Sequence, residues 1–163
     1  MTAAEKYAKL SSILNEGYAM SDTLPLSAKG RFQVVPILKG FAETVSREIQ
    51  TWPGIISATH WQLGRPTVVD GADFYVNEEE CGHIHLNGEV HLATSLDLRK
   101  QLVDAKLAHP FPYNASWVEI SIHDDASAKK AIWLFKLNYD RIKGLQLETL
   151  VDRISRSPFL KAS

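Results

Sequence analysis

The chain has 163 residues, of which 45% are hydrophobic and 23% are charged, a size and composition typical of one hydrophobic core. Its 18 basic and 19 acidic residues give a net charge of -1, so it lacks the broad positive surface that nucleic acids and anionic membranes select. The single cysteine, Cys81, rules out an internal disulfide and a cysteine-rich zinc site, which favours a reducing compartment.

No segment of the sequence is predicted to enter a membrane. Residues 1–14 contain Glu5, Lys6 and Lys9, so they lack the continuous apolar run of a signal peptide or an anchor. No later window reaches the ~18 uncharged apolar residues of a spanning helix. We therefore expect a cytoplasmic protein with neither a membrane nor a nucleic acid as partner, and the oligomeric state stays open.

The first 35 residues are predicted as an N-terminal part. An amphipathic pattern over residues 3–14 indicates a helix, and a long turn-rich connection follows to Val35. Residues 36–163 are predicted as the globular domain, with one globular unit overall. Its first element is a helix that ends at residues 52–54. The apolar face of this helix consists of Ile37, Phe41, Val45, Ile49 and Trp52.

Five strands are predicted from short runs of β-branched, aromatic or alternating residues. The first four follow one another closely enough to form an antiparallel meander, and they span residues 55–63, 72–76, 82–86 and 89–93. The fifth, residues 116–122, alternates so that Val118, Ile120 and Ile122 face the core.

Three more helices complete the pattern. Ser95 is the predicted N-cap of the first, and a Pro-interrupted loop over residues 108–115 follows it. Asp124 or Asp125 caps the second, which ends near Lys143-Gly144, and the last runs to about residue 154. The order of elements predicts an α+β fold, with an antiparallel β-meander sheet and helices packed mainly on one face.

Three of the six histidines lie in one predicted hairpin, whose register has two solutions. If Asn87-Gly88 forms a two-residue turn, His91 lies opposite Ile84 and faces away from His83 and His85. If residues 86–88 form a three-residue loop with Gly88 in a bulge position, His91 lies opposite His83. We favour the second register, in which His83, His85, His91 and Glu89 share one face.

A face with three imidazoles and a carboxylate supports two kinds of chemistry. The imidazoles titrate near neutral pH, and the carboxylate can fix a tautomer, which makes a proton-transfer site. Three imidazoles with an open position also suit zinc, iron or copper, and the spacing selects neither use. Any single histidine on a half-exposed strand is more often simply solvated.

The hairpin resembles the core of the fungal bioluminescence luciferases and their bacterial relatives. Residues 80–85, Glu-Cys-Gly-His-Ile-His, are similar to the Glu-x-small-His-x-His core of that family, and His91-Leu92 matches the His-Leu that follows. The resemblance continues through the helix after Ser95, the His109-Pro110 pair and Trp117, and it covers roughly residues 52–139. The loop between the second and third histidines is shorter here by an even number of residues, which favours the shared-face register.

The resemblance implies that an electron-rich hydroxypyrone is oxidised by molecular oxygen, without flavin or metal. For this chain we expect a hydroxypyrone or another electron-rich enol or phenol as the substrate. His83, His85 and His91 are then the candidates for the base and for oxyanion contacts, with Glu80 or Glu89 as the orienting carboxylate. Light emission does not follow from the resemblance, because fold-level kinship does not determine chemistry.

Four further residues are candidates for contacts with a small-molecule substrate. His109 lies in a loop that can close on the same face, and Trp117 can stack on a flat ligand. Arg31 and Arg65, in turn-rich segments, can hold an acidic substituent. All four types of residue are common in purely structural or surface roles, and Cys81 is expected to be a small packed hydrophobic residue.

Two other functions use the same residues. One is a small-molecule binding or sensing module without turnover, and the other is a metal-dependent enzyme. For any enzyme of this kind, we expect alanine at His83, His85 or His91 to abolish activity. Because half-exposed strand positions lie outside the core, each change should alter stability by less than ~1.5 kcal/mol.

Overall fold

The protein is described from a computed structural model, which covers residues 38–65 and 67–160. The predicted N-terminal helix and connection, with Arg31, lie outside these residues. The elements in chain order are α2 (Gly40–Gln50), β1 (Ile55–Trp61), β2 (Val69–Val76), β3 (Glu79–His85), β4 (Glu89–Leu92), α3 (Leu96–Asp104), β5 (His109–Pro110), β6 (Val118–Ser121), α4 (Asp125–Ile142) and α5 (Leu147–Ser155).

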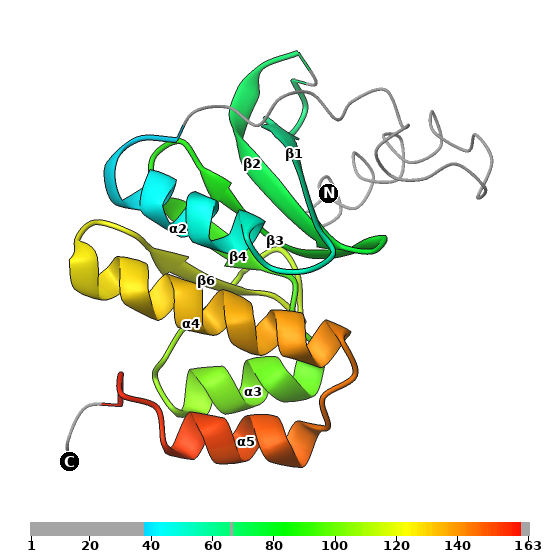
Figure 1. Ribbon diagram of the computed structural model, residues 1–163, viewed down its shortest axis with the longest axis vertical. Helices are drawn as coiled ribbons and strands as arrows, with labels where there is room; N and C mark the ends of the chain where they lie inside the picture. The colour runs from blue at the N-terminus through cyan, green and yellow to red at the C-terminus, as the bar shows by residue number, and fades with distance from the viewer. Residues whose placement is uncertain (1–37, 66, 161–163) are drawn as a thin grey trace.

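The strands form one open antiparallel sheet in the order β1-β2-β3-β4-β6-β5. The predicted meander is confirmed for β1 to β4, which pair with their neighbours in sequence. β6 then pairs with β4, so the chain returns to the sheet after α3 (Figure 1). The sheet therefore brings the β3–β4 hairpin to its centre, between β2 and β6.

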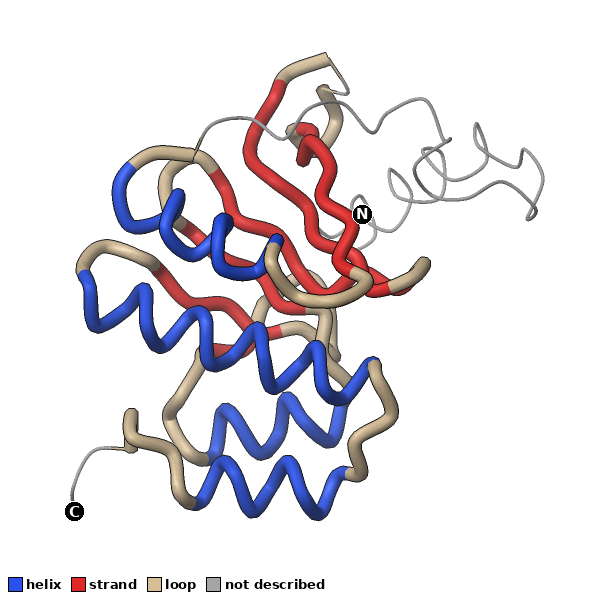
Figure 2. Tube along the Cα trace, viewed as in Figure 1, coloured by secondary structure: helices blue, strands red, loops and turns tan. Residues whose placement is uncertain are grey.

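The helices pack mainly on one face of the sheet, as predicted. α4 contacts β3, β4 and β6, and it lies between α2 and the pair formed by α3 and α5 (Figure 2). One buried cluster joins these helices to the sheet, and the rings of Phe74 and Phe135 meet edge to face at its centre, 5.6 Å apart. Val118, Ile120 and Ile122 are buried in it, which confirms the predicted alternation of that strand.

The helix caps follow from local sequence. Ser95 accepts a hydrogen bond from the backbone N–H of Leu98, as expected for an N-cap. Asp124, one of the two predicted caps of α4, accepts from the N–H of Ser127, and Ser127 returns a contact to the backbone of Asp124. Within the described ranges, no helix combines the length and the apolar character needed to cross a membrane.

One predicted loop contains a strand. His109 and Pro110 form β5, which pairs with the outer edge of β6 and places His109 opposite Glu119. The physical reason is that the outer edge of β6 carries unpaired backbone groups. Because Pro110 lacks an N–H, it is tolerated at the edge of a sheet.

Candidate active site

The β3–β4 hairpin adopts the three-residue loop. Gly88 has φ 87° and its N–H donates to the carbonyl of His85 at 3.0 Å, so residues 86–88 form the turn. His83 lies directly opposite His91, which confirms the favoured register and puts all three histidines on one face. A side chain at Gly88 would meet the carbonyl of Ile122 at 2.6 Å, so close packing against the end of β6 requires glycine here.

That face of the sheet is the one the helices leave open, and it carries a pocket of about 660 Å³. The floor comes from β1 to β4 and β6, while the walls come from the chain after β1 and the loop after β5. The lining residues are His60, Trp61, Gln62, Leu63, Asp70, His83, His85, Glu89, His91, Phe111, Pro112, Tyr113 and Glu119.

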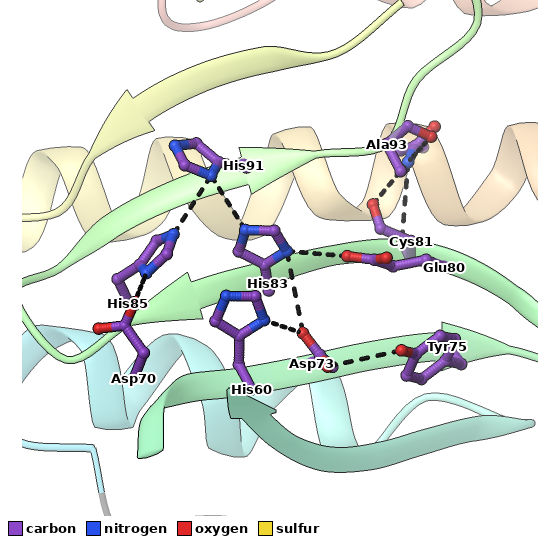
Figure 3. Close-up of polar contacts among 11 residues, drawn as sticks. His60, Asp70, Asp73, Tyr75, Glu80, Cys81, His83, His85, His91 and Ala93 are labelled. Carbon is purple, nitrogen blue, oxygen red and sulfur yellow. Dashed lines mark hydrogen bonds and ion pairs between the residues drawn. The ribbon is translucent and has the colours of Figure 1, made fainter. Parts of the chain in front are cut away.

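His83 is the centre of the polar network (Figure 3). It is only 4% exposed, and its Nδ1 lies 2.8 Å from Glu80 Oε1. Its Nε2 lies 2.9 Å from His91 Nδ1, so both nitrogens of this ring have a partner. Because a carboxyl group fixes one ring nitrogen, the other is oriented toward His91.

His85 and His91 complete the trio of predicted histidines. His85 Nδ1 lies 3.0 Å from Asp70 Oδ2, and its Nε2 lies 3.2 Å from His91 Nδ1 (Figure 3). The Nε2 of His91 is buried without a hydrogen bond, although Glu89 Oε1 is 3.4 Å away. Nδ1 of His91 is thus in contact with one nitrogen from each of the other two rings.

Glu80 reaches this site because β3 contains a β-bulge. Simple alternation would place Glu80 on the face opposite to His83. In the structure Phe74 pairs with Gly82 but Tyr75 pairs with Glu80, so Cys81 is the extra residue and Glu80 shares the face of His83. Glu80 therefore contacts His83, as predicted for a carboxylate in this site. The contact depends on the β-bulge, which the strand pattern did not indicate.

Gly82 and Asn138 hold the bulge. Gly82 has φ 153°, and a Cβ on it would meet the carbonyl of His91 at 2.5 Å. Asn138 is fully buried in α4, and its Nδ2 donates to the carbonyls of Cys81 and Ala93 at 2.8 and 3.1 Å. Cys81 itself is completely buried against α4, and burial raises the pKa of its thiol to about 12. The expected packing role of Cys81 is confirmed.

Sequence reasoning missed a fourth histidine. His60 in β1 stacks on His83 with ring centroids 4.0 Å apart, and its Nδ1 lies 2.6 Å from Asp73 Oδ1. His60 and Asp73 are 13 residues apart and meet only through the β1–β2 pairing, so no local motif joins them. The available signal was Asp73 itself, a charged residue in the otherwise uncharged strand 72–76.

Gly71 lets rings from two non-adjacent strands touch. It lies between His60 in β1 and His85 in β3, each of which pairs with it. The two rings meet edge to face across it, with centroids 4.9 Å apart. Any side chain at this position would also collide with the backbone of Ile84. The histidine cluster therefore depends on a glycine in the middle of β2.

Burial controls the charges in this cluster. Burial, together with the negative charge of Asp73, raises the pKa of Glu80 to about 8. Burial and the neighbouring histidines lower the pKa of His83 well below its usual value. Burial also lowers the pKa of His91 to about 4, with a further contribution from His85, although Glu89 opposes this shift. The imidazoles of His83 and His91 are therefore held neutral at pH 7.

Aromatic side chains pack over the histidines. The ring of Phe111 lies 4.1 Å from that of His91, and Tyr113 contacts Phe111 edge to face at 5.5 Å. Trp117 is 5.6 Å from His83 and also packs on Phe111. Trp117 therefore supports the wall of the site from behind, and the pocket lining does not include it.

Of the other predicted residues in the described part of the chain, some line the pocket and others do not. Glu89 lines it, together with Glu119, which sequence reasoning missed and which lies opposite His91 in β6. His109 is exposed on the edge strand and Arg65 is exposed in the β1–β2 connection, and neither lines the pocket.

The exposure assumed for the histidines was wrong for two of the three. His83 and His91 are 4% and 7% exposed, because the aromatic loop after β5 covers this face of β3 and β4. The side chain of His85 is 16% exposed. A small effect of alanine on stability is therefore expected only at His85.

Several side chains are placed to hold a metal ion. The groups whose possible ligand atoms lie within 4.8 Å of one another are His60, His83 and His85; Asp73, Glu80 and His83; and Glu89, His91 and Glu119.

Residues 78–138 match the family model described as the Luciferase domain. This segment of the chain is therefore similar to the luciferase-domain family. The luciferase domain as matched runs from the end of β2 into α4, and it contains Glu80, His83, His85, Glu89 and His91. The expected family is thereby confirmed, whereas His60 and its partner Asp73 lie outside the matched residues. No curated protein and no solved structure matches the chain.

Proposed function

We propose that this chain is an oxygenase of the luciferase type, which oxidises an electron-rich enol, hydroxypyrone or phenol with molecular oxygen. The observation that carries the proposal is the cluster of His83, His85 and His91 at the floor of an aromatic-walled pocket. The cluster lies within the segment that matches the luciferase domain.

The reaction needs a group that removes the enol proton. The resulting enolate carbon is electron-rich and adds O2, so a carbon–oxygen bond forms while two electrons pass from the substrate to oxygen. The proton then returns to the new peroxide, and substrate plus O2 give a hydroperoxide with no other reactant. His83, His85 and His91 are the proposed base and oxyanion contacts, and Glu80 and Glu89 orient them.

The walls support the second requirement, which is exclusion of water from the peroxide. Phe111 covers His91, and Trp61, Leu63 and Tyr113 line the rest of the pocket. Flat apolar walls also favour a flat conjugated substrate over a flexible polar one. A volume of about 660 Å³ is in the range of small-molecule sites.

Oxygen consumption by the purified full chain tests the proposal. Protein of known metal content is mixed with a 3-hydroxypyrone and a panel of related phenols, and light emission is recorded in parallel. We expect protein-dependent oxygen uptake that His85→Ala abolishes. His123→Ala is the matched control, because His123 is an exposed histidine outside the pocket.

Each outcome separates the candidate functions. Uptake that is lost in His85→Ala and kept in His123→Ala supports the oxygenase. Measurable ligand binding without uptake contradicts it and points to a binding or sensing module. Uptake that is unchanged in His85→Ala contradicts the assignment of the reaction to this pocket.

A further inference from the structure

We propose that His83, His85 and His91 bind one divalent transition-metal ion, and a ligand nitrogen of His60 lies within 4.8 Å of those of His83 and His85. The ligand atoms are Nε2 of His83, Nε2 of His85 and Nδ1 of His91. This inference does not rest on the proposed oxygenase reaction, because it concerns the resting protein without substrate.

The distances between these nitrogens fit a shared ion. Nε2 of His83 and Nε2 of His85 lie 2.9 and 3.2 Å from Nδ1 of His91. Imidazole nitrogens bind zinc at about 2.0–2.1 Å, so two ligands of a tetrahedral ion lie about 3.3 Å apart. Two of the three nitrogen pairs are therefore already close to the separation of two ligands on one ion.

The ring orientations agree with the distances. The three rings have centroids 4.8 to 4.9 Å apart and planes at 73° to 86° to one another. These rings do not stack on one another, and the Nε2 atoms of His83 and His85 both approach Nδ1 of His91. A proton can join two of these nitrogens along one line, whereas an ion can bond to all three.

Each histidine also has the outer partner that metal-binding histidines usually have. Metal ligands of this type commonly hold a carboxylate or carbonyl with their second nitrogen, which fixes the ring and raises its basicity. Glu80 lies 2.8 Å from Nδ1 of His83, and Asp70 lies 3.0 Å from Nδ1 of His85.

The remaining two histidines repeat the pattern. Glu89 lies 3.4 Å from Nε2 of His91, and Asp73 lies 2.6 Å from Nδ1 of His60. For His91 this carboxylate lies beside Nε2, the nitrogen that does not contact His83 and His85.

Acidic side chains surround the pocket. Five carboxyl groups, from Asp70, Asp73, Glu80, Glu89 and Glu119, surround the histidines. Among the residues described, no lysine or arginine lines the pocket. Imidazole donors favour first-row transition ions over Mg²⁺ or Ca²⁺, which prefer oxygen ligands. We therefore expect zinc, iron, nickel or copper in the divalent state.

The ion would lie at the floor of the pocket, where its remaining positions face the ligand space. An ion there would accept the oxygen of an ionised enol, and the histidines would then act through it instead of as free bases. The family resemblance implied a metal-free reaction, so this inference departs from that expectation on the geometry of the side chains.

Metal titration of the full chain tests the site without substrate or oxygen. Protein stripped with a chelator is titrated with Zn²⁺ by calorimetry and with Co²⁺ by visible absorption, which reports nitrogen coordination. We expect about one equivalent of each ion to bind, together with a rise in the thermal unfolding temperature. His85→Ala and His91→Ala should lose this binding, whereas His123→Ala should keep it.

A milder variant keeps the test decisive if a histidine variant fails to fold. Asp70→Asn keeps every metal ligand and removes only the carboxylate that contacts Nδ1 of His85, so the affinity for the metal ion should fall by about 10–100-fold.

Failure of the stripped wild-type protein to bind either ion would overturn the proposed metal site. Binding of equal strength in His85→Ala or Asp70→Asn would also overturn it. Oxygen-uptake results do not bear on either outcome, so the metal site and the oxygenase reaction fail separately.

Discussion

Each of the four histidines in the pocket lies beside at least one carboxyl group, and these contacts orient the rings. His83, His85 and His60 contact their carboxyl groups through Nδ1, at 2.6 to 3.0 Å. The other nitrogen of each of these rings is left for a neighbour, an ion or a ligand. Changes to a carboxylate should therefore act on function through the histidine it holds.

Alanine at His83 and alanine at His85 should have the same effect on activity but different effects on stability. Both changes should abolish activity, because both rings belong to the cluster. His85→Ala should cost less than ~1.5 kcal/mol of unfolding free energy, as for a partly exposed position. His83→Ala should cost more, about 2–3 kcal/mol, because it leaves a cavity and unpaired buried groups. Urea denaturation measures both, and equal costs would contradict the assigned burial.

Replacing the carboxyl group of Glu80 should slow turnover without unfolding the protein. In Glu80→Gln the amide fills the same space but replaces the carboxyl group that contacts Nδ1 of His83, so activity should fall by about 10–100-fold. Glu78→Gln is the matched control, since Glu78 is exposed in the turn before β3. Steady-state oxygen uptake and circular dichroism are compared, and equal activity in the two variants would exclude a role for Glu80.

At the scale of single elements, the bulge in β3 decides which residues face the pocket. It turns Cys81 toward α4 and brings Glu80 to the face of His83. Gly82 makes the bulge sterically possible, and Asn138 ties it to the helix by hydrogen bonds. The geometry of the site therefore depends on the contact between β3 and α4, which packs on the opposite face of the sheet.

Alanine at Gly82 should destabilise the fold more than alanine at Gly54. Both glycines have positive φ, so both changes carry backbone strain of about 1–2 kcal/mol. Only at Gly82 does the added Cβ also meet backbone, at 2.5 Å from the carbonyl of His91, which should add about 1–3 kcal/mol. Free energies from urea unfolding give the comparison. A Gly82→Ala variant no less stable than Gly54→Ala would show that the bulge tolerates a side chain.

Leucine at Asn138 should weaken the link between α4 and the hairpin. The change removes the donor to the carbonyls of Cys81 and Ala93 and the acceptor of Arg141 Nε, all at a fully buried position. We expect a loss of about 1–3 kcal/mol in unfolding free energy, accompanied by reduced activity. Chemical denaturation and oxygen uptake measure the two effects, and full retention of both would contradict this role.

At the scale of the whole molecule, the sheet separates a structural face from a chemical one. The helices cover the first face (Figure 1). One continuous apolar cluster fills the space between them and the sheet, and the pocket lies on the second face. The walls of the pocket come from the chain after β1 and the loop after β5, which are far apart in sequence. Assembly of the pocket therefore requires the complete sheet.

We expect the helical layer and the pocket side to unfold together in a single transition. Trp52 and Trp133 pack with the helical layer, whereas Trp61 and Trp117 lie on the pocket side. Because one core joins the two layers, tryptophan fluorescence and far-ultraviolet circular dichroism should give coincident denaturation curves. Fluorescence that changes at a lower denaturant concentration than the helix signal would instead show that the pocket side unfolds separately.

Local sequence was sufficient for the elements and for part of the site. Periodicity and caps located the helices, including Ser95 and Asp124, and the positions of Gly88 and the three hairpin histidines favoured the register that the structure has. These features depend on residues within a few positions of one another. For that reason they can be predicted from one sequence.

The tertiary structure alone decided the rest. His60 reaches His83 only through two strand pairings, and the bulge at Cys81 depends on contact with Asn138, 57 residues away. The burial of His83 and His91 depends on a loop that returns after α3. The sequence by itself determined which side chains carry the chemistry of the hairpin. Long-range pairing determined their neighbours, their burial and their charge, because these arise between segments that share no local pattern.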